Sequence, residues 1–233
     1  MDALLAFLRR RVERGAPVGL GVTLALVATV LALWAFLGVV DSVTEQDDLF
    51  RFDAGAHAAV YAFVGPSREG LVWAVTWLGN NATLIAFVAL TAAALLAARR
   101  RDLAFRVVLA SGVGGLVELG LKSLFHRARP LEQVVSAQGF SLPSGHAFAS
   151  TVFYGMLVYL VWRLTDRAWA RALSAAMGLV VVGAVGLSRV YLNVHFLTDV
   201  VAGWAAGTAW LVAVLVVVHV AEYRWTARRR RAA

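Results

Sequence analysis

The stretch PVGLGVTLALVATVLALWAFLGVV, residues 17–40, decides the fold class, because it carries no charged side chain and is long enough to cross a membrane as one helix. A hydrocarbon core of about 30 Å needs about 20 apolar residues in a row. The run is too long for the apolar part of a cleaved signal peptide, and no convincing cleavage site follows it. We therefore expect an uncleaved first membrane span.

The composition extends this pattern to the rest of the chain. Of the 233 residues, 61% are hydrophobic and 15% are charged, and the mean hydropathy is +0.74, whereas a soluble domain has about 25% charged residues. We expect an all-α polytopic membrane protein with one transmembrane domain over residues 1–233, since no long polar segment could hold a second domain. Six spans are predicted, at residues 18–40, 71–98, 103–122, 144–164, 172–188 and 194–221.

Two segments between and within these runs are less regular. The fifth span, 172–188, is short and rich in Gly and Ala. Small residues permit close helix packing, so we expect a buried helix there. The segment 47–66 is amphipathic and carries four aromatic residues. It is either a helix lying in the outer interface or an ordinary connecting loop, and the sequence leaves both open.

Charge gives the orientation of the spans. The formal net charge of +8 comes from arginines at the ends of apolar runs, which indicates membrane topology rather than nucleic-acid binding. Four basic segments lie between or beside the spans. RRRVER precedes span one, and ARRRD joins spans two and three. RLTDRAWAR joins spans four and five, and WTARRRR follows span six. With six spans all four fall on one side, which the positive-inside rule makes cytoplasmic. We therefore expect a plasma (inner) membrane protein with both termini in the cytoplasm.

Three short polar motifs stand between the apolar runs: KSLFHRARP from Lys122 to Pro130, PSGH from Pro143 to His146, and SRVYLNVHFLTD from Ser188 to Asp199. In the predicted topology, spans three and five end at the outer face, and spans four and six begin there. Motifs far apart in the sequence are thus expected at one membrane level, on the extracytoplasmic side.

The cations of these motifs suit a phosphate. Arginine offers a planar fork to phosphoryl oxygens, and lysine offers a point charge. A single cation at a helix end is usually a side chain that reaches for the interface. Three cations at one membrane level, beside two histidines, instead predict an anion site. These cations are Lys122, Arg129 and Arg189. The start of span four adds unpaired N–H groups, with Ser144 as a candidate N-cap and Gly145 allowing close approach of a ligand.

A nucleophile and an acid are also present. His195 and Asp199 are four residues apart, so they share a helix face. A carboxylate can accept the Nδ1–H of the imidazole, which leaves Nε2 free to attack. His146 stands at another helix start and is the candidate proton donor to the leaving oxygen. An aspartate within a membrane span is costly, which favours a functional role over simple packing.

Other polar residues have less defined roles. Glu118 lies four residues before Lys122 and either orients it or is purely structural. His126 and Arg127 lie inside the first motif as candidate accessory contacts. His57 is expected in a loop, with no evident partner. The absence of cysteine excludes disulfides and thiolate catalysis.

The three motifs resemble those of the type 2 phosphatidic acid phosphatase family, the membrane lipid phosphatases related to the vanadium haloperoxidases. The family pattern is K-x6-R-P, then P-S-G-H, then S-R-x5-H-x3-D, and this chain matches every fixed position. The resemblance implies that His195 forms a phosphohistidine, that Asp199 orients it, and that His146 is the general acid. It also implies that the phosphoryl oxygens are held by Lys122, Arg129, Ser144, Gly145, Ser188 and Arg189, with no metal or other cofactor.

The expected activity is hydrolysis of a lipid phosphate or diphosphate. Undecaprenyl diphosphate, phosphatidate and phosphatidylglycerol phosphate are the candidates, and the small size of the chain slightly favours the isoprenyl diphosphate. One alternative is a phosphotransferase that resolves the same phosphohistidine with a sugar or inositol hydroxyl. Another is a non-enzymatic lipid binder or transporter. A vanadate haloperoxidase is disfavoured, since that relative is soluble, and the oligomeric state is left open.

Overall fold

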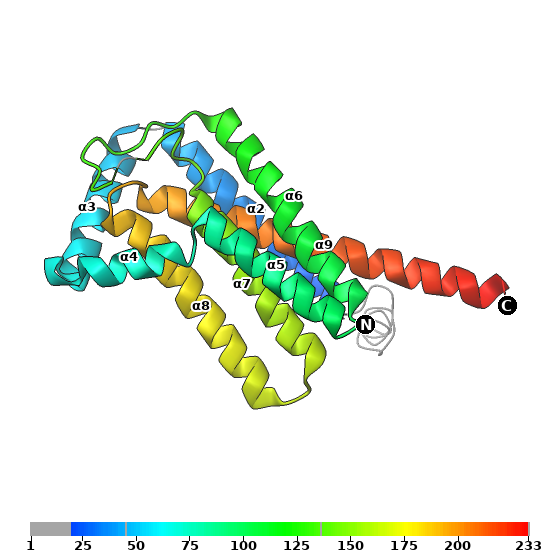
Figure 1. The fold of residues 1–233 in the computed structure, drawn as a ribbon. Coiled ribbons are helices and arrows are strands. Elements are labelled where there is room, and N and C mark those ends of the chain that lie inside the picture. The colour runs from blue at the N-terminus through cyan, green and yellow to red at the C-terminus, as the bar shows by residue number, and fades with distance from the viewer. Residues whose placement is uncertain (1–19, 45, 136, 233) are drawn as a thin grey trace.

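The computed structural model describes residues 20–44, 46–135 and 137–232, and this part of the chain is all-helical, as predicted (Figure 1). The basic segment before the first span lies outside the described residues. A 3-10 turn at Pro66–Arg68 joins two of the helices. The α-helices are α2 (Leu20–Thr44), α3 (Gln46–Val64), α4 (Glu69–Trp77), α5 (Asn81–Ala97), α6 (Arg101–Phe125), α7 (Gly145–Leu164), α8 (Ala168–Tyr191) and α9 (Leu197–Ala232).

The second predicted span is not one helix. Five of the described helices are long and apolar enough to cross a membrane, and a sixth span arises only if α4 and α5 are joined across a 46° bend. The break has a local cause, because the Asn80 side chain accepts the Ala82 N–H at 2.9 Å and starts α5 as its N-cap. Tyr154 of α7 donates its hydroxyl to the Leu78 carbonyl at 2.9 Å and holds the break in place.

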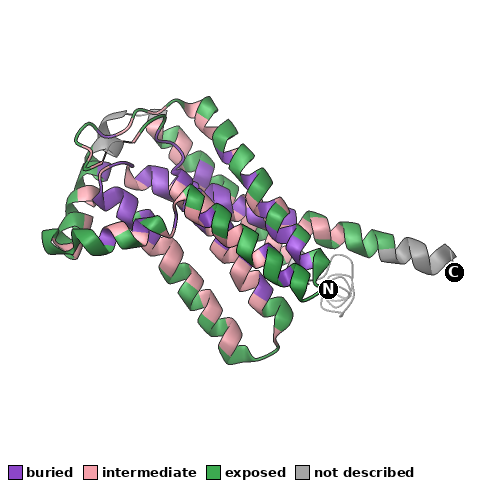
Figure 2. Ribbon diagram, viewed as in Figure 1, coloured by how far each residue is buried: buried purple, intermediate pink, exposed green. Residues whose placement is uncertain are grey.

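Helices α7 and α9 form the centre of the bundle, where buried residues concentrate (Figure 2). Phe148 and Val152 of α7 pack in one apolar cluster with Val107 of α6 and Ala202 of α9. The two central helices approach closely, since a Cβ at Gly203 of α9 would lie 2.6 Å from the Ser144 carbonyl oxygen. This contact fixes the start of α7 against α9.

The prediction that the fifth span is a buried helix is wrong. Only 11% of the residues in the apolar stretch of α8 are buried. The buried residues gather at its C-terminal end, from Val185 to Tyr191. Small residues do allow close contact at two positions, where Gly178 faces Val158 and Gly186 faces Trp204. The rest of α8 turns apolar side chains outward, which suits a helix that meets lipid.

Segment 47–66 is largely helix α3, so the helical alternative is the correct one. His57 lies on this helix rather than in a loop, and it has a partner, because its Nδ1 is 2.8 Å from the Val190 carbonyl oxygen of α8. This bond joins α3 to the end of α8 that leads into the third motif.

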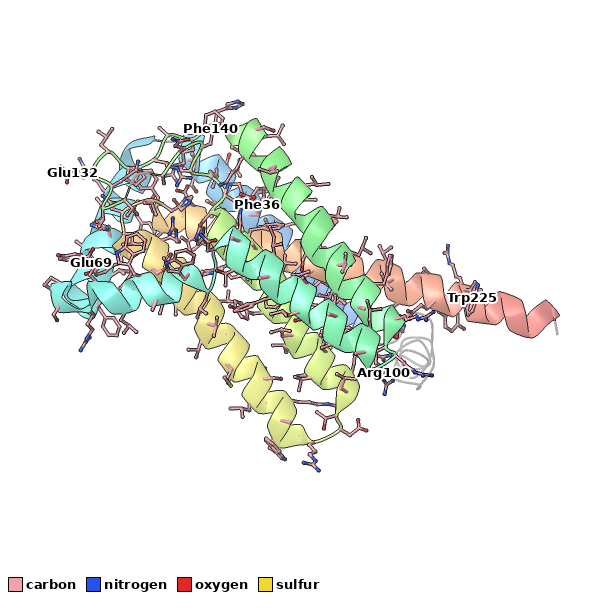
Figure 3. All side chains as sticks on the ribbon, viewed as in Figure 1. Phe36, Glu69, Arg100, Glu132, Phe140 and Trp225 are labelled. Atoms are coloured by element: carbon pink, nitrogen blue, oxygen red, sulfur yellow. The ribbon has the colours of Figure 1, made fainter. Side chains whose placement is uncertain are left out.

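The helix ends that carry the motifs meet at one end of the bundle. In Figure 3, Glu132 and Phe140 of the loop between α6 and α7 lie at the end opposite Arg100, the N-cap residue of α6. The connection from α8 to α9 joins the same end, since Val134 N–H donates to the Leu192 carbonyl at 3.1 Å. The predicted convergence of the motifs at one level is therefore confirmed for the bundle itself.

Candidate active site

The second and third motifs are joined through their backbones. Ser144 N–H, immediately before α7, donates to the Asp199 carbonyl in the first turn of α9 at 2.9 Å. An ideal Cβ at Gly145 would lie 2.5 Å from Glu118 Oε1 and 3.3 Å from Lys122 Nζ. Glycine at this position thus lets the start of α7 lie directly against the end of α6, which brings the first motif to the other two.

His195 faces Asp199 as predicted, at an ion-pair distance rather than a hydrogen-bond distance, but the two do not share a helix face, because His195 lies in the bend before α9 begins at Leu197. Their Nδ1 and Oδ2 atoms are 3.6 Å apart, and both side chains are buried. Two other donors fix the orientation of the Asp199 carboxylate. Phe196 N–H donates to Oδ2 at 2.9 Å, and Arg127 NH1 donates to Oδ1 at 2.5 Å. The carboxylate therefore holds the start of α9 and lies beside the imidazole at the same time.

Arg129 identifies the tautomer of His195. Its NH1 group is 3.1 Å from His195 Nε2, and a guanidinium can only donate hydrogen bonds. Nε2 must therefore accept, which places the proton of a neutral imidazole on Nδ1, facing Asp199. The same guanidinium donates to the carbonyls of Val194, Gly139 and Gln138, so the loop before α7 and the loop before α9 hold it from two sides.

Burial and nearby cations keep His195 neutral. Its pKa is lowered from 6.5 to about 4: desolvation by burial is the main cause and Arg129 and Arg189 act in the same direction, whereas Asp199 acts in the raising direction. Burial also lowers the pKa of Arg129, against the attraction of Asp199 and Glu118. The site thus presents an uncharged imidazole nitrogen among positive groups.

Lys122 and Glu118 form the expected contact, with Nζ and Oε1 3.0 Å apart on α6. Arg189 of α8 donates to the Thr76 hydroxyl of α4 at 2.7 Å in a buried contact. His146 stands in the first turn of α7, and a Cβ at Gly79 would lie 3.3 Å from its Cδ2. The break between α4 and α5 therefore supports both a candidate cation and the candidate acid. His146 lies within electrostatic reach of Lys122, Arg129, Arg189 and His195.

Three buried polar atoms of this cluster have no hydrogen-bond partner: Ser144 Oγ, Arg189 Nε and His195 Nδ1. Ser144 occupies the N-cap position of α7 as predicted, but its hydroxyl does not cap the helix. Ser188 is already engaged, because its hydroxyl donates to the Val185 carbonyl at 2.7 Å. Buried polar atoms are normally paired, so donors of this kind in one place favour an anionic ligand.

The comparison with known proteins agrees with this geometry. Residues 103–223, which include all three motifs, match the PAP2 superfamily. The chain belongs to the PAP2 superfamily. It is a membrane lipid phosphatase of the PAP2 type, with several membrane-spanning helices.

Two relatives show how far the likeness extends. Phosphatidylglycerophosphatase B of Bacillus subtilis (strain 168) is 26% identical over 179 residues, which are 76% of this chain and 88% of the relative. A crystal structure of a transmembrane PAP2 type phosphatidylglycerolphosphate phosphatase from Bacillus subtilis has a TM-score of 0.73 at 26% identity, covering 80% of this chain and 94% of that one. The crystal structure of LpxE from Aquifex aeolicus has a TM-score of 0.55 at 18% identity over 68% and 92% of the two chains, which is a likeness of fold alone.

This PAP2 chain has an apolar cavity beside the site. Its volume is about 600 Å³, and helices α5, α6 and α7 line it. Leu84 and Val88 contribute from α5, Leu119 from α6 and Phe153 from α7. Glu118 belongs to both the cavity wall and the Lys122 ion pair, so the cavity adjoins the polar cluster.

Two residues of this neighbourhood were not assigned from the sequence: Thr76 supports Arg189, and Asp53 of α3 accepts from Arg127. Arg127, a candidate accessory contact, donates to Asp199. His126 ends α6 in a left-handed conformation with its ring edge-on to Phe140, at 4.4 Å between centroids. Within the described residues, no group of three or more His, Cys, Asp or Glu side chains is placed to hold a metal ion.

Proposed function

We propose that this PAP2 phosphatase hydrolyses a lipid phosphomonoester at the extracytoplasmic face of the plasma membrane, with phosphatidylglycerol phosphate as the first candidate, through a phosphohistidine at His195. The observation that carries the proposal is the unprotonated Nε2 of His195, which accepts from Arg129 and is surrounded by cations. A nitrogen of this kind is a competent nucleophile at neutral pH.

In the first step, Arg129 shifts its NH1 hydrogen bond from Nε2 of His195 to a phosphoryl oxygen, which frees the Nε2 lone pair. Nε2 then attacks phosphorus, and the bond from phosphorus to the lipid oxygen breaks. His146 donates a proton to the departing alcohol oxygen, so the lipid leaves neutral at that atom. The imidazole gains positive character, which Asp199 stabilises from the Nδ1 side at 3.6 Å. Arg129, Arg189 and Lys122 hold the phosphoryl oxygens, and Ser144 and Gly145 add donors at the start of α7.

In the second step, water attacks the phosphohistidine from the side that the lipid oxygen has left. His146, now unprotonated, takes a proton from this water, and the N–P bond breaks. Inorganic phosphate is released, and both histidines return to their starting states. Glu118 orients Lys122 through the 3.0 Å ion pair during both steps.

The apolar cavity supports a lipid rather than a soluble phosphate ester. It joins the polar cluster at Glu118, so the phosphate can stay among the cations while an acyl chain lies between α5, α6 and α7. The relatives named as phosphatidylglycerophosphatases move the first candidate from the isoprenyl diphosphate to phosphatidylglycerol phosphate. Phosphatidate and undecaprenyl diphosphate remain the comparison substrates.

The test is phosphate release in detergent from all three lipids, by the natural chain and by His195→Ala. We expect the variant to lose about a thousandfold or more in kcat, as removal of a nucleophile does elsewhere. His219→Ala, in the part of α9 remote from the motifs, is the matched control and keeps normal turnover. Near-normal phosphate release by His195→Ala would refute the nucleophile.

Two further arms separate the alternatives. Activity is expected to persist in excess chelator; complete loss that magnesium restores would refute the metal-free mechanism. Adding inositol or a sugar as acceptor should leave phosphate as the main product. Transfer of the phosphoryl group to the acceptor would assign the chain to the phosphotransferases instead, and lipid binding without any turnover would assign it to the binders.

A further inference from the structure

Asp53 is a fully buried carboxylate that none of the three motifs contains. It lies on α3 with 1% of its surface exposed, and three donors reach it. Oδ1 accepts the Thr198 N–H at 3.0 Å, and Oδ2 accepts the Thr198 hydroxyl at 2.7 Å and Arg127 NH2 at 2.9 Å. Ionised groups are rarely buried without a partner and a purpose, so this carboxylate needs an explanation.

Arg127 connects Asp53 to the candidate dyad. Its NH2 group contacts Asp53, and its NH1 group contacts Asp199 Oδ1 at 2.5 Å and the Thr198 hydroxyl at 2.8 Å. The guanidinium also lies over the Phe196 ring, 4.2 Å from its centroid. The planar fork is thus clamped between two carboxylates, and Asp199 in turn faces His195.

The charges of this chain of contacts explain why two carboxylates are present. Arg127 and Asp199 alone would form a neutral pair behind His195. Asp53 restores one net negative charge to the cluster, and in a buried site that charge acts on the imidazole with little screening. A histidine that becomes positive during phosphoryl transfer needs such a charge, since Arg129 and Arg189 already act against its protonated form.

We propose that Asp53 is a positioning residue for the reaction, acting through Arg127 and Asp199 to keep one net negative charge behind His195. The proposal rests on the proposed nucleophilic role of His195. It also gives α3 a role in the site, because this helix lies outside the matched residues 103–223 and places the Asp53 carboxylate behind Asp199 and His195. Thr198 fixes the position of Asp53 relative to α9.

A purely structural role for Asp53 would fasten α3 to the start of α9 and nothing more. The two accounts differ for paired substitutions. Asp53→Asn makes the cluster neutral, Arg127→Met leaves it doubly negative, and the double variant Asp53→Asn/Arg127→Met returns it to one negative charge. The charge account therefore predicts recovery in the double variant, whereas a fastening role predicts that losing two contacts is at least as harmful as losing one.

The experiment measures kcat and KM for lipid phosphate release by purified full-length protein in detergent, with folding checked by thermal melting. For Asp53→Asn we expect kcat to fall about tenfold or more while KM changes less than about threefold, because the chemistry and not the phosphate grip is affected. The double variant should regain at least about threefold in kcat over Asp53→Asn. Asp166→Asn, an exposed carboxylate between α7 and α8, is the matched control and keeps normal activity.

Each other outcome is decisive. Asp53→Asn within about threefold of the natural kcat, or a double variant no better than the single one, overturns the proposal. If Asp53→Asn does not fold, the comparison moves to Arg127→Met, in which the doubly negative cluster favours the protonated form of His195 that cannot attack. Adding Asp53→Asn should then raise kcat, and a further fall overturns the proposal. The proposed function fails separately, and only if the natural chain releases no phosphate or His195→Ala still does.

Discussion

At the scale of single residues, Thr76 holds Arg189, one of the cations proposed to bind the phosphate, from outside the motifs. Its hydroxyl accepts from Arg189 NH1 in a buried contact of 2.7 Å. Thr76→Val keeps the shape and leaves a buried guanidinium N–H without this partner, a loss of about 1–3 kcal/mol. We expect kcat/KM for the lipid phosphate to fall about tenfold or more.

The measurement is steady-state phosphate release over a range of lipid concentrations. Thr151→Val is the matched control, because the Thr151 hydroxyl bonds only to the Ala147 carbonyl of its own helix among the contacts described. The control should keep its kcat/KM. Equal losses in both variants would show that Thr76 does not act through Arg189.

The pH dependence of turnover follows from the burial of His195. In the proposed mechanism the neutral imidazole attacks, and its pKa is lowered from 6.5 to about 4, chiefly by burial. Activity that depends on this group is therefore kept as the pH falls through 6.5 and lost only as it approaches about 4. The substrate phosphate has its own ionisation near pH 6, at about the value of a phosphorylated side chain.

Comparing a monophosphate and a diphosphate lipid separates the two effects in kcat/KM profiles. If the pH at which kcat/KM falls on the acid side differs between the two lipids, that fall reports ionisation of the substrate phosphate. A limb that stays near the ordinary histidine value with both lipids would show that His195 is not held neutral by its surroundings.

The sequence could predict the motif residues because their spacing carries the information. The four-residue spacing of His195 and Asp199 predicted that the two meet, and the structure places them 3.6 Å apart, although His195 precedes α9 instead of lying on a shared helix face. Thr76 and Asp53 could not be found this way. Thr76 lies in an apolar run like any tolerated hydroxyl, and Asp53 becomes a partner of Arg127 only after α3 folds back over the helix ends.

At the scale of elements, the break between α4 and α5 is the feature that most affects the site. Gly79 lies in this break, and a Cβ there would collide with Val185 of α8 and press on His146. Gly79→Ala should therefore displace the candidate acid, and we expect kcat to fall about tenfold or more with a smaller change in KM.

A second substitution tests this explanation. Val185→Ala removes the atom that the new methyl group meets first, so Gly79→Ala/Val185→Ala should recover part of the lost kcat. Gly183→Ala on α8 is the control, since a Cβ there meets nothing within 4 Å. A double variant as impaired as Gly79→Ala would mean that contact with α8 is not the cause.

The elements also show where hydropathy stops being informative. Apolar runs located the spans, and the prediction of one helix over residues 71–98 arises because Gly79 and Asn80 lower the hydropathy of the long apolar run too little to divide it. The Asn80 cap is a helix-start signal that overrides it locally. For α8, Gly and Ala content could not tell a helix facing protein from one facing lipid, because that depends on which neighbours surround it.

At the scale of the whole molecule, arginines with little exposed surface join helices toward both ends of the bundle. Arg127 clamps the site end, and Arg106 near the start of α6 donates to the Tyr159 hydroxyl of α7 at 2.5 Å and contacts Glu222 of α9. Helices α6, α7 and α9 are thus joined at the end remote from the site. Such ties leave the helix ends at the site with a fixed relative position, which a phosphoryl-transfer site requires.

The orientation of this bundle in the membrane can be tested by cysteine labelling, since the natural chain contains no cysteine. Leu131 is fully exposed in the loop between α6 and α7, beside the site. Asp166 is exposed between α7 and α8, at the opposite end. We expect Leu131→Cys to react with a membrane-impermeant maleimide in intact cells, and Asp166→Cys to react only after permeabilisation.

The physical reason is the distribution of arginines. The connections at the Asp166 end carry clusters around Arg99–Arg101 and Arg163–Arg171. At the site end, Lys122, Arg127 and Arg129 are held by carboxylates, carbonyls or His195, so they are less free to act as topology signals. Labelling of Asp166→Cys in intact cells, with Leu131→Cys protected, would place the site in the cytoplasm. The lipid phosphate would then have to be presented on the inner leaflet.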